Sequence, residues 1–283
     1  MIKSISIETE EGTYAGDMVF TPNLPPPPPP SVDRKYVFLN VPNWLPIDNL
    51  PLQYASEFSY FVLPVSASGM LMGTSDAAER FFVSKVIAAG KKPTFTVGGG
   101  TQSASDITAA ITLNKNAFIN NITEHLTRYN FSGVCIDIEN ISIAPQSIVD
   151  FIKLLRIKFD SVKIGLKIGI YSQPYSKDTI WLKIQDAVDS FDFLSVMVYD
   201  FPNTVADLRR ITLDWLPRVA GRRDKLLVGA AVNYNTTGLN EMEFGEVLDW
   251  ISDQGLKGIA IWNSSLFTQT YREILKNKFL SVE

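Results

Sequence analysis

Cysteine and histidine, which supply many disulfide, metal and nucleophilic sites, are almost absent from this sequence. The 283 residues include one cysteine and one histidine, His125. A single cysteine excludes an intramolecular disulfide and a cysteine zinc site, and a single histidine excludes a multi-histidine metal site. His125 is the one candidate for a serine–histidine dyad, but it lies near the end of a predicted helix, where it suits the helix dipole. We therefore expect no metal, no cofactor and no catalytic role for His125.

A basic excess and a long apolar run are also missing. Lysine and arginine number 26 against 30 acidic residues, a formal net charge of −4, whereas a general nucleic-acid binder needs a basic face. No apolar run approaches the ~20 residues of a membrane-spanning helix. Residues 1–14 have no apolar core, unlike a secretory signal. We expect no nucleic-acid or membrane partner. A cytoplasmic protein, export by a non-classical route and a chain numbered after processing all stay open.

Six consecutive prolines, Pro25–Pro30, mark the clearest boundary in the chain. Such a run favours the extended polyproline helix at ~3.1 Å per residue, which gives a stiff spacer of roughly 19 Å. We expect an N-terminal arm (1–24), a proline-rich linker (25–33) and one main domain (34–283). The arm is too small to bury a core and is predicted to be a disordered or loosely packed tail. The alternative is an arm that docks onto a protein partner.

After the linker, short β-branched and aromatic runs alternate with longer amphipathic stretches. Eight strands, each followed by a helix, over about 250 residues predict a single-domain α/β fold, a (β/α)8 TIM barrel. The predicted strands are Tyr36–Val41, Tyr60–Val65, Thr94–Val97, Gly133–Ile138, Ile164–Ile170, Phe193–Tyr199, Leu226–Val232 and Gly258–Trp262. The predicted helices are Asn49–Ser56 (short), Asp76–Ala89, Asp106–Tyr129, Gln146–Phe159, Thr179–Ser190, Ala206–Val219, Glu241–Asp253 and Phe267–Phe279.

A doubly wound open sheet is the alternative to a barrel. It is disfavoured because no G-x-G-x-x-G opens a helix after the first strand. Gly98, Gly99 and Gly100 follow the third strand, but no lysine follows them as in a phosphate-binding loop. In a barrel these glycines form a tight turn at the mouth, where backbone approaches a ligand.

The fourth predicted strand carries the chemistry. Because side chains alternate along a strand, Cys135, Asp137 and Glu139 share one face, with about 6.6–7 Å per two-residue step. Reactive groups of such barrels lie at the C-terminal ends of the strands. Burying two acids is costly without a purpose, and a nearby like charge raises the pKa of a carboxyl group. We expect one of the two to stay protonated as a general acid. The alternative is a structural pair bridged to an arginine.

This strand resembles glycoside hydrolase family 18, the chitinases and endo-β-N-acetylglucosaminidases. The family pattern is D-G-x-D-x-D-x-E, and residues 132–139 read S-G-V-C-I-D-I-E. Four further stretches resemble the family in the expected order: the end of the first strand, the S-x-G-G of the third, the M-x-Y-D of the sixth and the tryptophan of the eighth. In this chain they are Val41–Trp44, Thr96–Gly99, Met197–Asp200 and Ile261–Trp262.

The resemblance implies substrate-assisted retaining hydrolysis, an exception to the two-carboxylate scheme. Glu139 would be the general acid and base, and Asp137 would orient the 2-acetamido group and stabilise the oxazolinium. Tyr199 would bond to the acetamido oxygen and Asp200 would line the same pocket. The implied catalytic set is therefore Glu139, Asp137, Tyr199 and Asp200. The predicted substrate-binding set is Trp262, which would stack on the sugar, with Trp44, Gly98, Gly99, Gln173 and Cys135.

Two positions depart from the family pattern. Ser132 stands where the family has its first aspartate, and Cys135 where it has the second, the inner partner of Asp137. A thiol is a weak donor and is mostly neutral at pH 7, so we expect slower turnover or a shifted pH optimum rather than loss of chemistry. With no basic group near it in sequence, Cys135 is expected to be a small buried hydrophobe rather than a nucleophile.

Three functions fit these residues. The first is an endo-acting hydrolase of β-1,4-linked N-acetylglucosamine polymers such as chitin, because short loops imply an open groove. The second is cleavage of the chitobiose core of N-glycans. The third is a lectin-like barrel that binds chitin or a related oligosaccharide with little or no turnover. Retention of Glu139 favours the two enzymes over the third.

Overall fold

The computed structural model describes residues 4–9, 12–17, 35–73, 75–139, 142–199, 204–234 and 238–280. The chain separates into two compact units, Met1–Asp33 and Arg34–Glu283. In the first unit, β1 (Ser4–Thr9) and β2 (Gly12–Asp17) form an antiparallel hairpin that pairs Ser4 with Asp17. We predicted that the arm is a disordered or loosely packed tail; residues 4–9 and 12–17 of it form this hairpin. The proline-rich linker lies outside the described residues.

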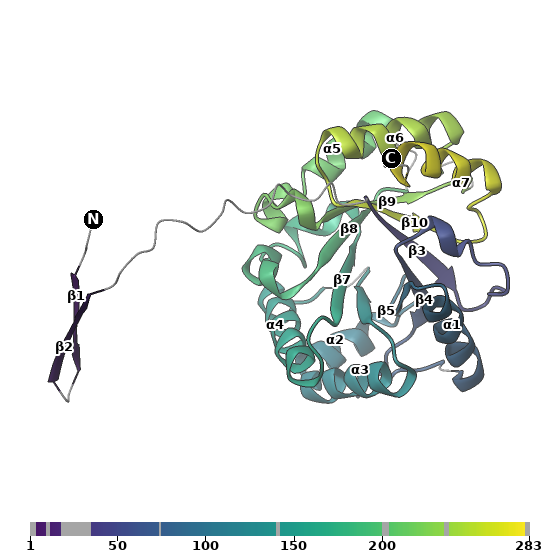
Figure 1. The fold of residues 1–283 in the computed structure, drawn as a ribbon. Coiled ribbons are helices and arrows are strands. Elements are labelled where there is room, and N and C mark those ends of the chain that lie inside the picture. The colour runs from purple at the N-terminus through teal and green to yellow at the C-terminus, as the bar shows by residue number, and fades with distance from the viewer. Residues whose placement is uncertain are drawn as a thin grey trace. The chain divides into compact units, whose positions relative to one another are not determined.

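The second unit contains a closed barrel of eight parallel strands (Figure 1). Around the barrel the order is β10, β3, β4, β5, β6, β7, β8 and β9, so the predicted (β/α)8 barrel is confirmed. The strand bounds are β3 (Tyr36–Pro42), β4 (Glu57–Leu63), β5 (Lys92–Gly98), β6 (Gly133–Asp137), β7 (Lys167–Ser172), β8 (Phe193–Met197), β9 (Leu226–Ala231) and β10 (Gly258–Trp262).

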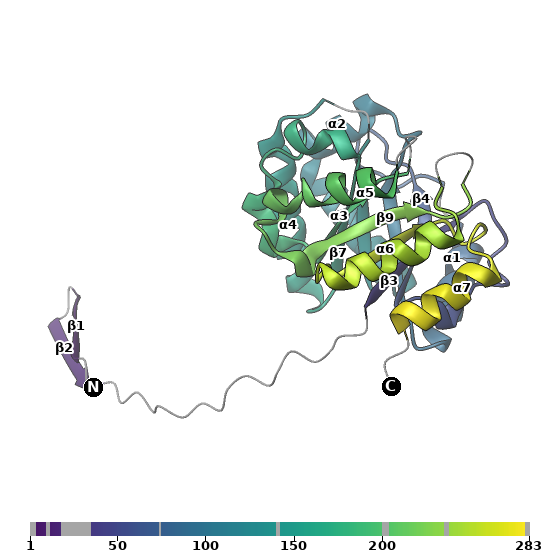
Figure 2. The ribbon, with the colours of Figure 1, turned by 90° about the horizontal axis from the view of Figure 1, so that it is seen from above.

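Helices surround the barrel on its outer side (Figures 1 and 2). They bury the outward residues of the strands, such as Val134 and Ile136, in one large apolar core. The α-helices are α1 (Asp76–Ala88), α2 (Ala104–Thr112), α3 (Lys115–Tyr129), α4 (Pro145–Val162), α5 (Val205–Leu213), α6 (Glu241–Asp253) and α7 (Gln269–Leu275).

Several predicted helices differ in the structure. Asn49–Ser56 is reduced to a 3-10 turn at Leu52–Tyr54, and Ala206–Val219 is divided into α5 and a 3-10 turn at Leu216–Val219. The stretch predicted as one helix, 106–129, is divided into α2 and α3, and the Asn114 side chain between them donates to the Ala67 carbonyl at 2.9 Å. The stretch 179–190 is no α-helix: 3-10 turns run over Pro174–Asp178 and Ile184–Ser190. Trp215 and Arg218 donate to backbone carbonyls in 174–177, so that backbone finds partners outside a helix.

A smaller group of side chains fills the inside of the barrel. We call it the interior cluster; its buried members are Phe38, Cys135, Tyr171, Phe193, Met197, Leu227 and Ala260. These positions alternate with the outward-facing positions along their strands, as a pleated strand requires. The barrel interior is therefore a packed core, and ligands can approach from an end of the barrel.

A buried charge closes the N-terminal end of the barrel interior. Glu57, 1% exposed, forms an ion pair with Lys167 and accepts a hydrogen bond from the Tyr36 hydroxyl. The Lys167 and Lys257 ammonium groups lie 4.8 and 5.2 Å from the centre of the Tyr36 ring. The negative charge of Glu57 is thus compensated where the strands begin.

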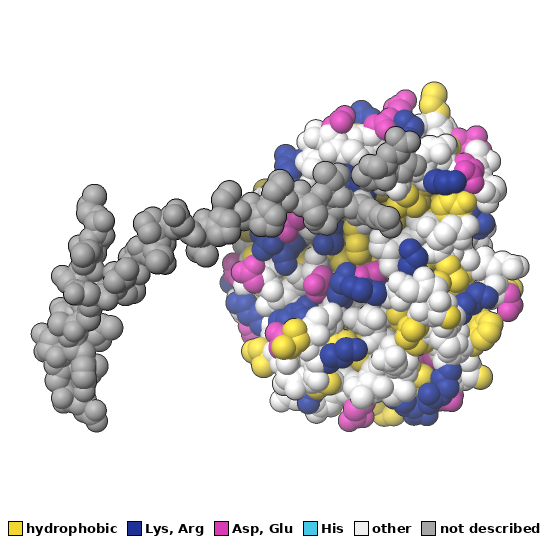
Figure 3. All heavy atoms as spheres, viewed as in Figure 1, with side chains coloured by type: hydrophobic (Ala, Val, Ile, Leu, Met, Phe, Trp, Pro, Cys, Tyr) yellow, Lys and Arg dark blue, Asp and Glu magenta, His cyan; other side chains and the backbone are white. Residues whose placement is uncertain are grey.

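The outer surface is mixed in character. Figure 3 shows one face, on which basic and acidic side chains are interspersed with apolar ones. No helix among the described residues is long and apolar enough to cross a membrane.

Candidate active site

A cavity of about 430 Å³ lies where the strands end. Its lining includes both acids of β6 and the tryptophan that ends β10, and it has a broad aromatic wall. The lining residues are Trp44, Phe61, Val62, Gly100, Thr101, Asp137, Glu139, Met197, Tyr199, Tyr234 and Trp262.

Glu139 is held by a neutral amide. The Gln173 side chain, 7% exposed, donates from Nε2 to Glu139 Oε2 at 2.9 Å. Glu139 follows β6 and Gln173 follows β7, two adjacent parallel strands, so the barrel brings them together. Gly100 lies against the same carboxyl group: a Cβ there would be 3.3 Å from Glu139 Oε1. Glu139 therefore reaches the cavity with one oxygen already bonded to a donor.

Asp137 ends β6 and is 1% exposed. Gly98 pairs with it in register, and the Gly99 amide donates to the Asp137 carbonyl at 2.9 Å. Gly98 has a φ of +102°, and a Cβ there would be 1.9 Å from that carbonyl oxygen. Gly98 and Gly99 thus allow β5 to approach the backbone of Asp137, whereas the next glycine, Gly100, lines the cavity.

Three aromatic rings form one wall of the cavity. The Trp262 and Phe61 ring centres are 4.6 Å apart, and Trp44 lies 6.5 Å from Trp262 and 6.2 Å from Phe61. Trp44 is 61% exposed. Indole faces suit the apolar face of a ring ligand, so this wall extends the cavity toward solvent.

The sixth barrel strand supplies Met197 and Tyr199 to the cavity. Of the predicted M-x-Y-D residues, Asp200 lies outside the described residues.

Cys135 is one step inside the cavity rather than on its wall. It is 1% exposed in the interior cluster. Burial raises the pKa of its thiol well above the usual value, and hydrogen bonds with Thr94 and Tyr171 oppose that change only in part. The thiol is therefore neutral, and Cys135 is packed as a small apolar residue below Asp137.

The charge in the cavity is acidic. Of the described residues that line it, two are carboxylic acids and none is lysine, arginine or histidine. A cation close to a carboxylate would lower its pKa by about 1–3 units. The hydrogen bond from Gln173 orients the Glu139 carboxyl group without bringing a charge next to it.

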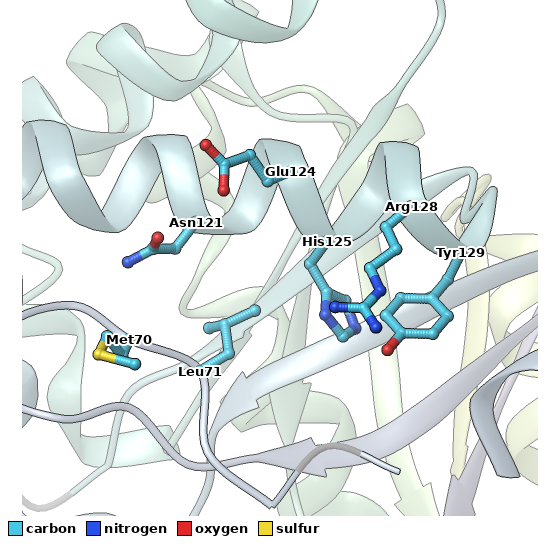
Figure 4. A pocket seen from close by; sticks show the side chains of 7 residues that line it. All are labelled: Met70, Leu71, Asn121, Glu124, His125, Arg128 and Tyr129. Carbon is cyan, nitrogen blue, oxygen red and sulfur yellow. The ribbon is translucent and has the colours of Figure 1, made fainter. Parts of the chain in front are cut away.

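His125 lies far from this chemistry, on the outer side of the barrel. It lines a surface hollow with residues of α3 and with Met70 and Leu71 (Figure 4). Its Nε2 lies 2.5 Å from Glu79 Oε2, and both side chains are buried. His125 therefore contributes to the packing of α1 against α3.

Sequence reasoning missed several wall residues: Phe61, Val62, Gly100, Thr101 and Tyr234. Gly100, Thr101 and Tyr234 follow predicted strands, so the rule that barrel sites lie at strand ends could have found Gly100. Phe61 and Val62 lie near the start of the predicted strand Tyr60–Val65, whereas the observed strand β4 ends at Leu63 and brings both to the cavity. Tyr234 lies beyond β9, in a stretch without a recognisable motif.

Comparisons with known proteins concern the family and the fold of this chain. The family model for glycosyl hydrolases family 18 matches residues 72–240. A search of curated proteins finds no match. Among solved structures, a chitinase from Rhizomucor miehei is 14% identical with a TM-score of 0.73, covering 86% of this chain and 99% of that one.

Two further structures share the fold. A Group IV chitinase from Ostrinia furnacalis is 13% identical with a TM-score of 0.74, covering 87% of this chain and all of that one. The Bacillus cereus spore cortex-lytic enzyme SleL is 13% identical with a TM-score of 0.70, covering 87% of this chain and 74% of that one. The family match spans more than half of the chain, and its residues lie in the same barrel as the candidate site. The chain belongs to glycosyl hydrolases family 18.

Proposed function

We propose that this protein is an endo-acting, chitinase-like hydrolase of β-1,4-linked N-acetylglucosamine polymers, with Glu139 as the general acid and base. The observation that carries the proposal is the pair of acids on β6 at the cavity, with Glu139 held by the neutral Gln173 amide at 2.9 Å. A general acid needs a proton that it can release, and a neutral partner does not fix its ionised form.

The first step follows from the hydrogen bond to Glu139. Glu139 carries an acidic proton in this step, and Gln173 orients its carboxyl group through the hydrogen bond to Oε2. Glu139 gives this proton to the glycosidic oxygen as the bond to the anomeric carbon breaks. The carbonyl oxygen of the substrate's own 2-acetamido group then bonds to that carbon and closes an oxazolinium ring.

Asp137 and Tyr199 act on the acetamido group. The ring that forms carries positive charge, and a fixed anion next to developing charge stabilises the transition state. The Asp137 carboxylate takes this role and accepts from the acetamido N–H, while the Tyr199 hydroxyl donates to the acetamido oxygen. Water then attacks the anomeric carbon as the bond from this carbon to the acetamido oxygen breaks and restores the acetamido group, and Glu139, now ionised, takes a proton from the water. The original anomeric configuration is thereby retained.

The exposed aromatic wall supports attack within a polymer. Trp44 is 61% exposed and lies 6.5 Å from Trp262, so stacking surface continues from the cavity into solvent. A sugar chain can bind across such a surface at internal units. This arrangement suits an endo-acting enzyme.

The test compares the wild-type protein with Glu139→Gln on chitooligosaccharides and on a high-mannose glycoprotein. We expect cleavage of chitooligosaccharides, with retention of anomeric configuration, and a loss of at least about 10³-fold in kcat in the variant, since the acid and base are both removed. Cleavage of the glycoprotein instead would assign the N-glycan activity. Binding by both forms without product would contradict hydrolysis and favour a lectin-like protein.

A further inference from the structure

Tyr171 is the direct neighbour of Asp137 in the barrel. The two residues pair in register on β6 and β7, and strands of a sheet lie about 4.8 Å apart. Both residues alternate with outward-facing isoleucines, so both side chains point into the barrel. Tyr171 is 3% exposed. A large phenol ring thus fills the interior beside and below the carboxyl group of Asp137.

The Tyr171 hydroxyl crosses the barrel. It donates to Asn40 Oδ1 at 2.8 Å, and Asn40 Nδ2 donates to the Ile261 carbonyl at 3.3 Å. Asn40 belongs to β3, which lies opposite β7 in the barrel order (Figure 1). Ile261 directly precedes Trp262. This hydrogen-bonded bridge therefore connects β7, the strand beside Asp137, through β3 to β10, which ends in Trp262 of the aromatic wall.

The space beneath the bridge is fully packed. Phe38 lies 6.1 Å from the Tyr171 ring and 5.2 Å from the Phe193 ring. A Cβ added to Gly169 would be 2.3 Å from Phe193 Cζ and 2.9 Å from Cys135 Sγ, so no free volume remains beside the thiol. Burial also raises the pKa of Tyr171 well above its usual value, which keeps the phenol neutral. On the β7 side the carboxyl group of Asp137 therefore lies against a packed, uncharged ring.

We propose that Tyr171, held by Asn40, is a positioning residue for Asp137 that fixes its carboxylate toward the substrate. The neutral bridge and Cys135 together fill the place where the family pattern has a second acidic side chain. Asp137 then works from one fixed orientation, and neither Tyr171 nor Cys135 adds a charge beside it. This inference rests on the proposed function.

Tyr171→Phe is the primary test, because the ring and its packing remain while the hydroxyl is lost. We expect kcat to fall about 10-fold with KM changed less than about threefold, as for an interaction that acts in the transition state. Loss of the hydroxyl makes the surroundings of Asp137 less polar, which raises the pKa of a carboxyl group. The acid limb of the kcat profile should therefore move to higher pH. Unchanged kcat and pH profile would overturn the proposal.

Tyr129→Phe is the matched control. Its buried ring also loses one hydrogen bond, from its hydroxyl to Asp76 Oδ1 at 3.1 Å, but on the outer side of the barrel. We expect the thermal midpoint to change about as much as in Tyr171→Phe, with kcat and the pH profile unchanged. Equal kinetic losses in both variants would mean that Tyr171 acts through stability, against the proposal.

A double-mutant cycle that combines Cys135→Asp with Tyr171→Ala tests whether Tyr171 and Cys135 fill the space of the family's second acidic side chain. In the wild-type background the new carboxyl group meets the packed Tyr171 ring and adds a like charge beside Asp137, so kcat should fall. In Tyr171→Ala the same substitution has room and returns an inner acidic partner, so kcat should rise above that of Tyr171→Ala. If Cys135→Asp lowers kcat by the same factor in the wild-type and Tyr171→Ala backgrounds, the proposal is overturned.

Failure of the proposed function gives a different experimental result from failure of the positioning role of Tyr171. A wild-type protein without turnover on any N-acetylglucosamine substrate removes the proposed function. In that case NMR follows the pH titration of the side-chain carboxyl carbon of Asp137, which reports on the surroundings of this group. The signal of that carbon is assigned by its absence in Asp137→Asn. A higher titration midpoint in Tyr171→Phe than in wild type supports the positioning role. Equal midpoints contradict it.

Discussion

The carboxyl groups at the two ends of the barrel interior have bonding partners of different kinds. At the end where strands begin, Glu57 is paired with Lys167 and bonded to Tyr36. At the end where strands finish, Glu139 is bonded to the neutral Gln173 amide, and the described lining of the cavity contains no basic side chain. Both ends place carboxyl groups among buried apolar residues, but only one end supplies a cation.

The difference separates a structural acid from a reactive one. An ion pair stabilises the charged form of both partners. A hydrogen bond from an amide fixes orientation and leaves protonation open. The same residue type, at the start of β4 and just after β6, therefore stabilises the barrel at one end and is available for proton transfer at the other.

Removing the cation at the closed end should produce the largest change in stability. Lys167→Met leaves the fully buried Glu57 carboxylate without its ion-pair partner, which we expect to cost about 3 kcal/mol in the free energy of unfolding. Urea unfolding measures it. The double variant with Glu57→Gln should recover most of the loss, because no uncompensated charge then remains. A stable single variant would show that the pair does not matter.

Placing a cation beside Glu139 should make the end of the barrel where the strands finish resemble the end where Glu57 is paired. Gln173→Lys puts an ammonium group where the amide donates to Glu139 Oε2. It should hold Glu139 ionised and lower its pKa, so kcat falls about 100-fold at neutral pH while the protein stays folded. Gln173→Met, which removes the hydrogen bond without adding charge, should lose only about 10-fold. Equal losses would contradict the electrostatic explanation.

The smallest expected effect concerns Lys257 at the closed end. Burial, and next the charge of Lys167, lower its pKa in the folded state. Between that lowered pKa and about 10.4, the value in an unfolded chain, the unfolded state binds more protons, so stability rises with pH. Lys257→Met should remove this rise and slightly raise stability at neutral pH. Urea unfolding at pH 7 and 9.5 measures both effects, and an unchanged slope would contradict them.

Local sequence patterns predicted the barrel but not every covering helix. Strands such as Gly258–Trp262 were predicted with correct bounds because strand burial leaves a continuous apolar run. The stretch 179–190 was misassigned: its backbone forms i to i+3 turns, such as Leu182 to Thr179, and the Ser190 carbonyl accepts from the distant Arg156. Contacts of that kind leave no periodic signal in the segment itself.

The same limit applies to the candidate site. Asp137 and Glu139 could be predicted because they lie two residues apart on one strand, and the structure brings both to the cavity. The bridge from Tyr171 to Asn40 joins residues 131 positions apart in the sequence. Neither residue belongs to a motif, and their relation follows from closure of the barrel.

Trp44 gives the protein its own optical signal. Its indole is 61% exposed at the cavity wall, whereas Trp181 and Trp215 are fully buried. A saccharide that stacks on Trp44 would shield it from water and from a soluble quencher such as iodide. Intrinsic fluorescence can then follow ligand binding in unlabelled protein, including variants that no longer turn substrate over.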